Sequence, residues 1–377
     1  MPWKEVTAMS ERCKFIEKAQ QEGSNMSVLC REFGISRTTG YKWLRRYIHA
    51  GSAGLQEQSR RPHCSPNQTC AEVEAAILQV RACHPSWGGV KILAYLERQG
   101  WRHLPSASTV TAILQRNGKI DPQEACKHRP MQRFERATPN ELWQMDFKGH
   151  FKLDQGRCHP LTILDDHSRF LLGLHACPNQ LWQTVQTQLT HTFRIYGLPD
   201  GMLMDNGSPW GDDHQSPYTI FTAWLMCLGV SVTHGRPYHP QTQGKDERLH
   251  RTLQAEVLDQ SGFHTLQECQ AQFDAWRNFY NRERPHQALQ QAVPAERYHA
   301  SSRPFPETLP PILYEPGDVV RMVDDTGKIS FHNRKIRISK AFRYFPVALR
   351  PTEPDGTFEV FYCSFKVAEI NLREHNC

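Results

Sequence analysis

Three carboxylates stand at positions where the surrounding sequence could bring them together. Asp146 lies in a segment that alternates between apolar and polar residues, and Asp205 directly follows the apolar residues 202–204. Glu247 lies at the start of a segment with helical periodicity, after a glycine-containing loop. Clustered carboxylates repel one another, so such a group is stable mainly with divalent cations between its members.

Acids grouped in this way indicate metal-assisted chemistry on phosphodiesters. Mg²⁺ and Mn²⁺ prefer oxygen ligands and leave coordination positions open for a phosphate and a nucleophile. Two ions about 4 Å apart support in-line displacement: one activates water or a 3′-hydroxyl, and the other stabilises the departing oxygen. No protein base is needed, so loop packing or DNA contact is the role expected of His234, His239, His250 and His286. The alternative is that each acid is an ordinary surface carboxylate or helix cap.

The acids can meet only if strands and helices carry them to one sheet edge. Periodicity of two over 142–148, followed by apolar runs, predicts strands at 142–148, 158–164, 170–175, 202–204 and 230–232. Helical periodicity predicts helices over 180–196, 219–228 and 245–258. This order is that of the ribonuclease-H-like fold, an α/β domain with a mixed five-stranded sheet and helices. In this order of strands and helices, Asp146, Asp205 and Glu247 can converge at one edge of the sheet.

The N-terminal region has the layout of a helix-turn-helix. Helices are predicted over 4–21, 26–33 and 37–48, with Gly34 as the left-handed stop and Ser36 as the cap of the third. Short polar side chains at the start of that third helix suit base edges, and later cations suit phosphates. The candidate DNA-contact residues are Arg37, Thr38, Thr39, Tyr41, Lys42, Arg45 and Arg46. The alternative is a generic three-helix bundle with a solvated basic face.

The rest of the chain divides into further units. Helices at 72–82, 90–99 and 109–116, the last capped by Ser108, predict a second helical DNA-binding unit. Short strands beyond residue 312, separated by Asp-Gly and Thr-Gly turns, predict a small SH3-like β-barrel. The expected organisation is helix-turn-helix 1–55, linker 56–70, second helical unit 71–120, linker 121–136, catalytic core 137–300 and barrel 312–377.

Charge and composition narrow the class of protein. Residues 1–62 carry 11 Lys and Arg against 6 Asp and Glu, whereas residues 137–300 carry 13 against 17. A basic N-terminal part and an acidic centre indicate a polyanion-binding region joined to a cation-binding core. The 12 cysteines include no C-x-x-C pair, which favours free thiols in a reducing cytoplasm over a zinc site. The apolar run 221–232 is too short to span a bilayer, and residues 1–5 lack an apolar signal core.

Five ordered segments resemble the integrase-core DDE transposases of bacterial insertion sequences. They are WQMDFKG (143–149), ILDDHSR (163–169), DNGSPW (205–210), RPYHPQTQGKDER (236–248) and YNRERPHQAL (280–289). With the helix-turn-helix upstream, the resemblance covers nearly the whole chain. It implies that Asp146, Asp205 and Glu247 are the catalytic acids and bind two Mg²⁺ or Mn²⁺ ions. The separation between Asp205 and Glu247 is longer than is usual in that family, and we expect the added residues at 211–216.

The resemblance also implies partners and a reaction. The expected protein binds double-stranded DNA at terminal inverted repeats, exposes a 3′-hydroxyl and joins it to target DNA, as a homo-oligomer in the bacterial cytoplasm on the nucleoid. No membrane partner is expected. Lys245, Arg248 and Arg251 are further candidate DNA contacts near Glu247, with a solvated cation as the alternative for each.

Several alternatives stay open on the sequence. Asp212 and Asp213 compete for the role of Asp205, and Asp165 and Asp166 are either extra ligands or, as we expect, part of a turn with Ser168 and Arg169. Trp210 and Tyr238 suit either base stacking or core packing. The competing functions are a domesticated DNA-binding regulator with a non-catalytic core, and a ribonuclease H that leaves the helix-turn-helix unexplained.

Overall fold

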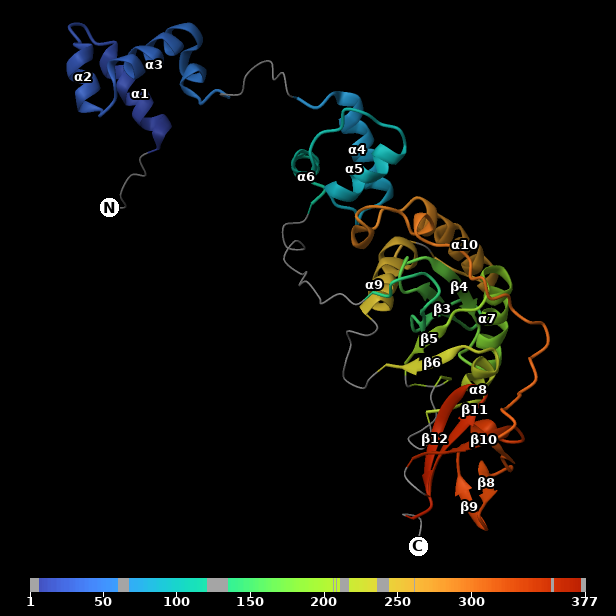
Figure 1. Ribbon diagram of the computed structural model, residues 1–377. Helices are drawn as coiled ribbons and strands as arrows, with labels where there is room; N and C mark the ends of the chain where they lie inside the picture. Colours follow the sequence, from blue (N-terminus) through green and yellow to red (C-terminus); the bar gives the residue numbers. More distant parts are fainter. Residues whose placement is uncertain are drawn as a thin grey trace. The chain divides into compact units, whose positions relative to one another are not determined.

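The computed structural model describes residues 7–59, 68–120, 135–205, 207, 209–210, 217–235, 244–260, 262–353 and 356–373 (Figure 1). The chain separates into two compact units, residues 1–68 and 69–377, and each is described by itself. Several sequence-predicted features lie outside the described residues, namely Asp212, Asp213, Tyr238, His239 and most of the two linkers. Among the helices that are described, none combines the length and apolar character that crossing a membrane requires.

The first unit is a three-helix domain of the predicted layout. It contains α1 (Ala8–Ala19), α2 (Met26–Glu32), α3 (Arg37–Ala50) and the 3₁₀ turn η1 (Gly51–Leu55). Asn25 and Ser36 cap α2 and α3 through their side-chain oxygens, as N-cap residues do. Its small core contains Phe15, Ile16, Leu29, Cys30, Trp43 and Leu55. α3 lies so close to α2 that a Cβ on Gly40 would be 2.6 Å from the sulfur of Cys30.

A second helical group opens the larger unit. It consists of α4 (Ala71–Cys83), α5 (Gly89–Arg98) and α6 (Ala107–Arg116), around a core that includes the fully buried Trp87. One prediction here was wrong: Ser106, not Ser108, caps α6 by accepting a hydrogen bond from the Thr109 backbone. Phe279 of the central domain packs against this core, so the helical group is docked rather than separate.

The centre of the larger unit is a mixed sheet. Its strands are β1 (Trp143–Phe147), β2 (Phe151–Lys152), β3 (Arg157–Asp165), β4 (Leu171–Cys177), β5 (Gly201–Met204) and β6 (Ser231–His234). β1 pairs antiparallel with β3 and parallel with β5, which in turn pairs parallel with β6, while β4 pairs antiparallel with β3. The predicted mixed sheet is confirmed, but with a sixth strand, because two residues of β2 also pair with β3.

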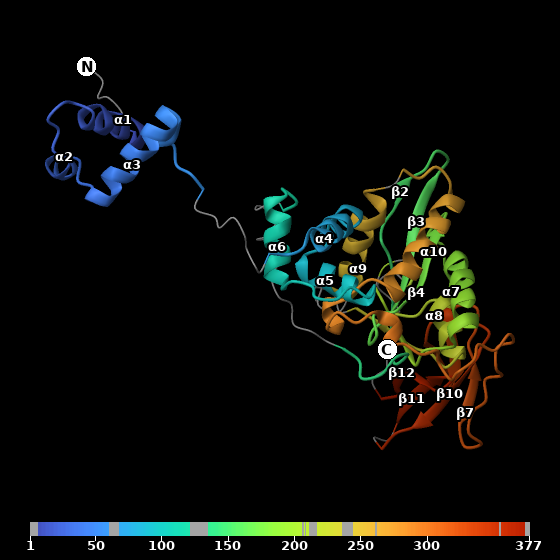
Figure 2. The ribbon, with the colours of Figure 1, turned by 90° about the horizontal axis from the view of Figure 1, so that it is seen from above.

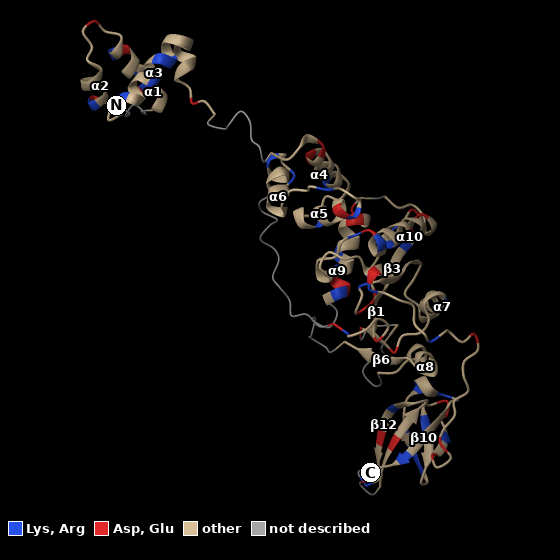
Figure 3. Ribbon diagram, turned by 45° about the horizontal axis from the view of Figure 1, so that its top comes forward, with Lys and Arg blue, Asp and Glu red and all other residues tan. Residues whose placement is uncertain are grey.

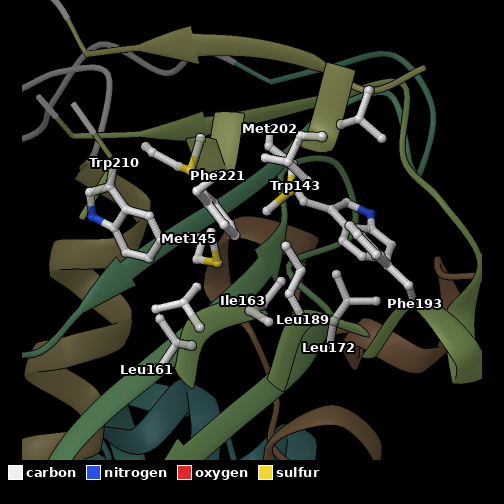
Figure 4. Close-up of a cluster of buried hydrophobic side chains, with 14 of the residues drawn as sticks. Trp143, Met145, Leu161, Ile163, Leu172, Leu189, Phe193, Met202, Trp210 and Phe221 are labelled. Carbon is white, nitrogen blue, oxygen red and sulfur yellow. The ribbon is translucent and has the colours of Figure 1, made fainter. Parts of the chain in front are cut away.

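Helices cover both faces of this sheet. The core on one face joins the strands to α7 (Trp182–Tyr196) and α8 (Ile220–Cys227), with Trp143, Ile163 and Phe193 among its side chains (Figure 4). The opposite face packs against α9 (Gly244–Leu253), its π-helical continuation η4 (Gln254–Leu258) and α10 (Leu266–Arg282). Figures 1 and 2 show α7 and α9 on opposite sides of the strands.

The helix α10 was missed by the sequence analysis. Its signals were present: Thr265 and Glu268 form a capping box, and apolar residues recur at Phe273, Trp276 and Tyr280. The side chain of Asn281 pins its end to β4, donating to the Leu171 carbonyl at 2.9 Å and accepting from the Leu171 amide at 2.8 Å. Tyr280 and Asn281 of the YNRERPH segment therefore serve packing of α10 against the sheet.

The C-terminal strands form two sheets. β7 (Val319–Met322), β10 (Pro346–Pro351), β11 (Thr357–Tyr362) and β12 (Phe365–Asn371) make a four-stranded antiparallel sheet, and β8 (Lys328–Phe331) pairs with β9 (Arg334–Arg337). Among the described residues the four-stranded sheet and the hairpin do not close, so the predicted SH3-like barrel is not confirmed. Ala223, Met226 and Cys227 of α8 belong to the core beneath these sheets, although the other side of α8 packs on the central sheet.

Candidate active site

Asp146 and Asp205 are the two predicted acids that the structure brings together. The register of the neighbouring strands β1 and β5 pairs Gln144 with Leu203, which sets Asp146 level with Asp205 two residues further on. Both side chains are partly exposed at the ends of their strands. Burial, reinforced by the charge of Asp205, raises the pKa of Asp146 to about 7, and burial also raises the pKa of Asp205.

Backbone amides hold both carboxylates in place. Oδ1 of Asp146 accepts a hydrogen bond of 2.8 Å from the amide of Phe147, and Oδ1 of Asp205 accepts one of 3.0 Å from the amide of Gly207. Gly207 allows this approach, since a Cβ there would lie 3.3 Å from Oδ2 of Asp205. Two partly desolvated acids with mutual repulsion form an arrangement that a divalent cation would stabilise.

Helix α9 carries, beside Glu247, the acid Asp246, which the sequence analysis did not single out. Asp246 is 1% exposed, and burial, followed by the charges of Asp146 and Asp166, raises its pKa well above the ordinary value. Within the described part of the chain its Oδ1 has no hydrogen-bond partner. Glu247, the predicted third acid, is exposed in the same helical turn. In the ranges that the structure describes, no three His, Cys, Asp or Glu side chains are grouped closely enough to hold a metal ion.

His250 lies beside Asp146, one turn along α9 from Asp246. Its Nδ1 is 3.9 Å from Oδ2 of Asp146, and its Nε2 is 2.9 Å from the hydroxyl of Thr162. Burial, with a contribution from Lys148, lowers the pKa of His250 to about 4, so the ring is neutral at pH 7. A neutral imidazole here adds no positive charge to compete with a cation. The i, i+4 spacing of Asp246 and His250 was the available signal for a shared helix face.

The raised pKa of Asp146 predicts how stability depends on pH. In the unfolded state the carboxyl of Asp146 has the ordinary pKa of 3.8, so the folded state binds this proton more tightly than the unfolded state. The stability of the folded state therefore falls as the pH rises from 3.8 to about 7. In a buffer without divalent ions, Asp146→Asn should therefore stabilise the protein by about 2 kcal/mol at pH 8 and by much less at pH 4. Thermal unfolding at both pH values measures this, with Asp274→Asn, which replaces an exposed acid, as the control. Equal effects of Asp146→Asn at both pH values would contradict it.

Asp165 and Asp166 are used inside the fold. Asp165 accepts from the amide and hydroxyl of Ser168, and Arg169 adopts a positive φ of 63° in the turn that follows. Asp166 accepts from Gln144 and pairs with Lys245, whose pKa burial lowers to about 8. Lys245 is thus held within the protein, whereas Arg248 and Arg251 are exposed on α9. Figure 3 shows the acidic and basic segments side by side along α9.

Other predicted side chains serve packing. Trp210 is 1% exposed, and its ring centroid lies 5.7 Å from that of Phe147 and 5.7 Å from that of Phe221. Figure 4 shows Trp210 beside Phe221. His234 bridges the carbonyls of Asp205 and Pro217. His286 is buried and packs edge-on against Tyr280 at 4.5 Å.

Helix α3 presents most of the predicted DNA-contact residues to solvent. Arg37, Thr38, Tyr41, Lys42 and Arg45 are exposed, and basic segments mark this helix in Figure 3. Thr39 is half-buried, and its hydroxyl lies 2.9 Å from that of the cap residue Ser36. Arg46 is also half-buried and lies over the ring of Trp43 at 5.2 Å.

Domain families match most of the described chain. The family "Integrase core domain" matches residues 136–240, and a second family of that description matches 228–294. "Helix-turn-helix domain" matches 11–63 and "Homeodomain-like domain" matches 39–114. At the C-terminal end, residues 318–377 match "IS481 family transposase, C-terminal domain". The chain thus combines a helix-turn-helix region, an integrase core domain and a C-terminal domain similar to that of an insertion-sequence transposase family.

Individual relatives are distant. An "Insertion element IS407 uncharacterized 31.7 kDa protein" of Burkholderia multivorans is 26% identical over 160 residues, covering 42% of this chain and 56% of the relative. The "Transposase for transposon Tn552" of Staphylococcus aureus is 24% identical over 316 residues, covering 74% of this chain and 64% of the relative. The chain therefore covers less than two thirds of the length of either relative. A solved structure of a simian T-cell lymphotropic virus intasome, in complex with a PP2A regulatory subunit, contains a similar chain. The match covers 79% of this chain and 96% of that chain, at 16% sequence identity. Its TM-score of 0.38 is too low to support a conclusion.

Proposed function

We propose that this protein is a DNA transposase that binds the terminal inverted repeats of an insertion sequence, cuts DNA strands there and joins them to target DNA. The observation that carries this proposal is the pair of partly buried carboxylates, Asp146 and Asp205, on adjacent parallel strands of an integrase core. Two neighbouring acids that are costly to ionise without a cation suit a site whose charge is balanced by bound metal ions.

The proposed cofactors are two Mg²⁺ or Mn²⁺ ions, held by Asp146, Asp205 and Glu247. When bound, such ions activate the attacking hydroxyl and stabilise the leaving oxygen. The protein's own part is positional: amides of Phe147 and Gly207 fix the two aspartates, and neutral His250 lines the side of Asp146. Glu247 lies in the first turn of α9 on the exposed side, and Asp246 is its rival as the third acid because it is buried and the charge of Asp146 helps to raise its pKa.

The remaining expectations complete this proposal. We place the domains at 1–55, 71–120, 137–300 and 312–377, and assign DNA or subunit contacts to the C-terminal sheets. Assembly as a homo-oligomer would hold two DNA ends together, in the cytoplasm on the nucleoid. The similarity to integrase-core and helix-turn-helix families supports these assignments by analogy.

The decisive experiment supplies the chain with Mg²⁺ and labelled ends of the element that encodes it. Nicking at the inverted repeat followed by strand joining would support the proposal. Binding without cleavage, in Mg²⁺ and in Mn²⁺, would instead indicate the DNA-binding regulator. Cleavage restricted to RNA–DNA hybrids would indicate a ribonuclease H.

Recognition by α3 makes a separate prediction. Lys42→Glu or Arg45→Glu should weaken binding to the inverted repeat about tenfold or more, since each removes an exposed cation and adds repulsion toward phosphates. Electrophoretic mobility shift at fixed salt measures the affinity. The control is Lys14→Glu on α1, which is also exposed but lies outside the candidate contact set. Affinity unchanged in both α3 variants would contradict the assignment of this helix.

A further inference from the structure

A buried carboxylate outside the proposed active site joins three parts of the larger unit. Glu256 lies in η4, the π-helical turn that continues α9, and its side chain is only 5% exposed. Turns of π-helix are rare and frequently occur at functional sites. Because η4 continues α9, Glu256 lies on the same continuous helix as Asp246, Glu247 and His250. It lies about 13 Å from Glu247 along the helix axis.

Two of the contacts of Glu256 are made to the central domain. Arg284 binds it with a forked set of hydrogen bonds, from Nη2 to Oε1 at 2.9 Å and from Nε to Oε2 at 3.0 Å. The indole N–H of Trp276 on α10 donates to Oε2 at 3.2 Å. Burial is the largest single influence and would raise the pKa of Glu256, but the charge and hydrogen bonds of Arg284, the hydrogen bond from Trp87 and the charge of Lys91 together lower it. The carboxylate is therefore ionised and charge-balanced within the core.

The third contact reaches the helical group α4–α6. The indole N–H of Trp87, in the turn before α5, donates to Oε1 of Glu256 at 3.0 Å. The Trp87 ring is fully buried in a stack with His84, at 4.0 Å, and with Phe279 of α10, at 5.9 Å. His84 also stacks directly on Phe279, at 5.1 Å. An indole donor to a buried carboxylate is a charge-assisted bond that fixes direction as well as contact.

We propose that Glu256 is a positioning residue. It locks the helical group α4–α6 onto the continuous helix formed by α9 and η4. DNA bound by this helical group would then meet the acid site in one register. The register part of the proposal rests on the proposed function, whereas the locking does not. A second contact from the helical group reaches the central domain elsewhere, at the 3₁₀ turn η6 (Pro294–Glu296). This ion pair of Arg98 with Glu296, at 2.5 Å, is more exposed, at 32% and 48% of the side chains, and provides a comparison.

Hydrogen exchange on the full chain tests the locking. Trp87→Phe keeps an aromatic ring for the stack but removes the N–H, and Glu256→Gln removes the charge that holds Arg284. In both variants, amides of α5 and η4 should exchange about tenfold faster than in the wild type, as expected for the loss of one bond to a buried charged group. Arg98→Ala should stay within about twofold. Wild-type exchange in Trp87→Phe and Glu256→Gln would overturn the proposal, and so would an equal effect of Arg98→Ala.

Mapping of cleavage positions tests the register. On DNA ends that the wild type nicks at one phosphodiester, Trp87→Phe should spread nicks over neighbouring positions, an effect that a mere loss of stability would not produce. A single unchanged nick position, together with faster exchange in α5, would overturn the positioning role. If the wild type cuts none of these ends, the proposed function fails, and the exchange result still decides whether Glu256 locks the two parts.

Discussion

Replacing Asp146 or Asp205 by asparagine is expected to reduce DNA cleavage about a thousandfold or more, while binding to the inverted repeat stays within about twofold of the wild type. Asparagine keeps the size of the side chain but removes the negative charge that a divalent cation needs. Both acids lie at a strand end in the central domain, whereas α3 belongs to the other compact unit, so DNA recognition should survive. Gel assays of nicking and of binding on the same labelled DNA measure the two effects separately.

The third acid is decided by comparing Glu247→Gln with Asp246→Asn. We expect Glu247→Gln to abolish cleavage, which would require α9 to present its exposed face to the aspartates when metal and DNA are bound. Loss of cleavage in Asp246→Asn with wild-type rates in Glu247→Gln would show that the buried neighbour is the ligand and that the assignment of Glu247 is wrong. Asp274→Asn, which replaces an exposed acid of α10, should cut at the wild-type rate.

Arg284→Ala should destabilise the protein by about 3–5 kcal/mol, the largest effect on stability that we expect. The change leaves Glu256 as an uncompensated charge in a pocket where the two side chains are 5% and 8% exposed. Denaturant unfolding monitored by tryptophan fluorescence measures the loss. Arg282→Ala removes an exposed arginine two residues away and should cost less than about 0.5 kcal/mol. Similar stabilities of the two variants would show that the buried pair contributes little.

The sequence analysis predicted the central sheet because its signals are local. Alternation around Asp146 and the apolar stretch before Asp205 identify strands, and the strand order then places both acids on neighbouring strands. The face of α9 could not be read in the same way. Lys245, Asp246, Glu247 and Arg248 are all charged, so the sequence does not show which of them α9 buries together with Leu249 and Leu253. The contacts of Glu256 could not be predicted from the sequence for a similar reason, because Trp87 lies far from Glu256 along the chain.

Helix α8 has a consequence for anyone preparing the central domain alone. One side of this helix fills the core of the central sheet, and Ala223, Met226 and Cys227 on the other side are covered by the C-terminal strands. A fragment that stops before β7 would turn those side chains toward water, and contiguous apolar surface of this kind promotes self-association. Such a truncated preparation should aggregate or oligomerise through α8, so its assembly state would not represent that of the intact chain.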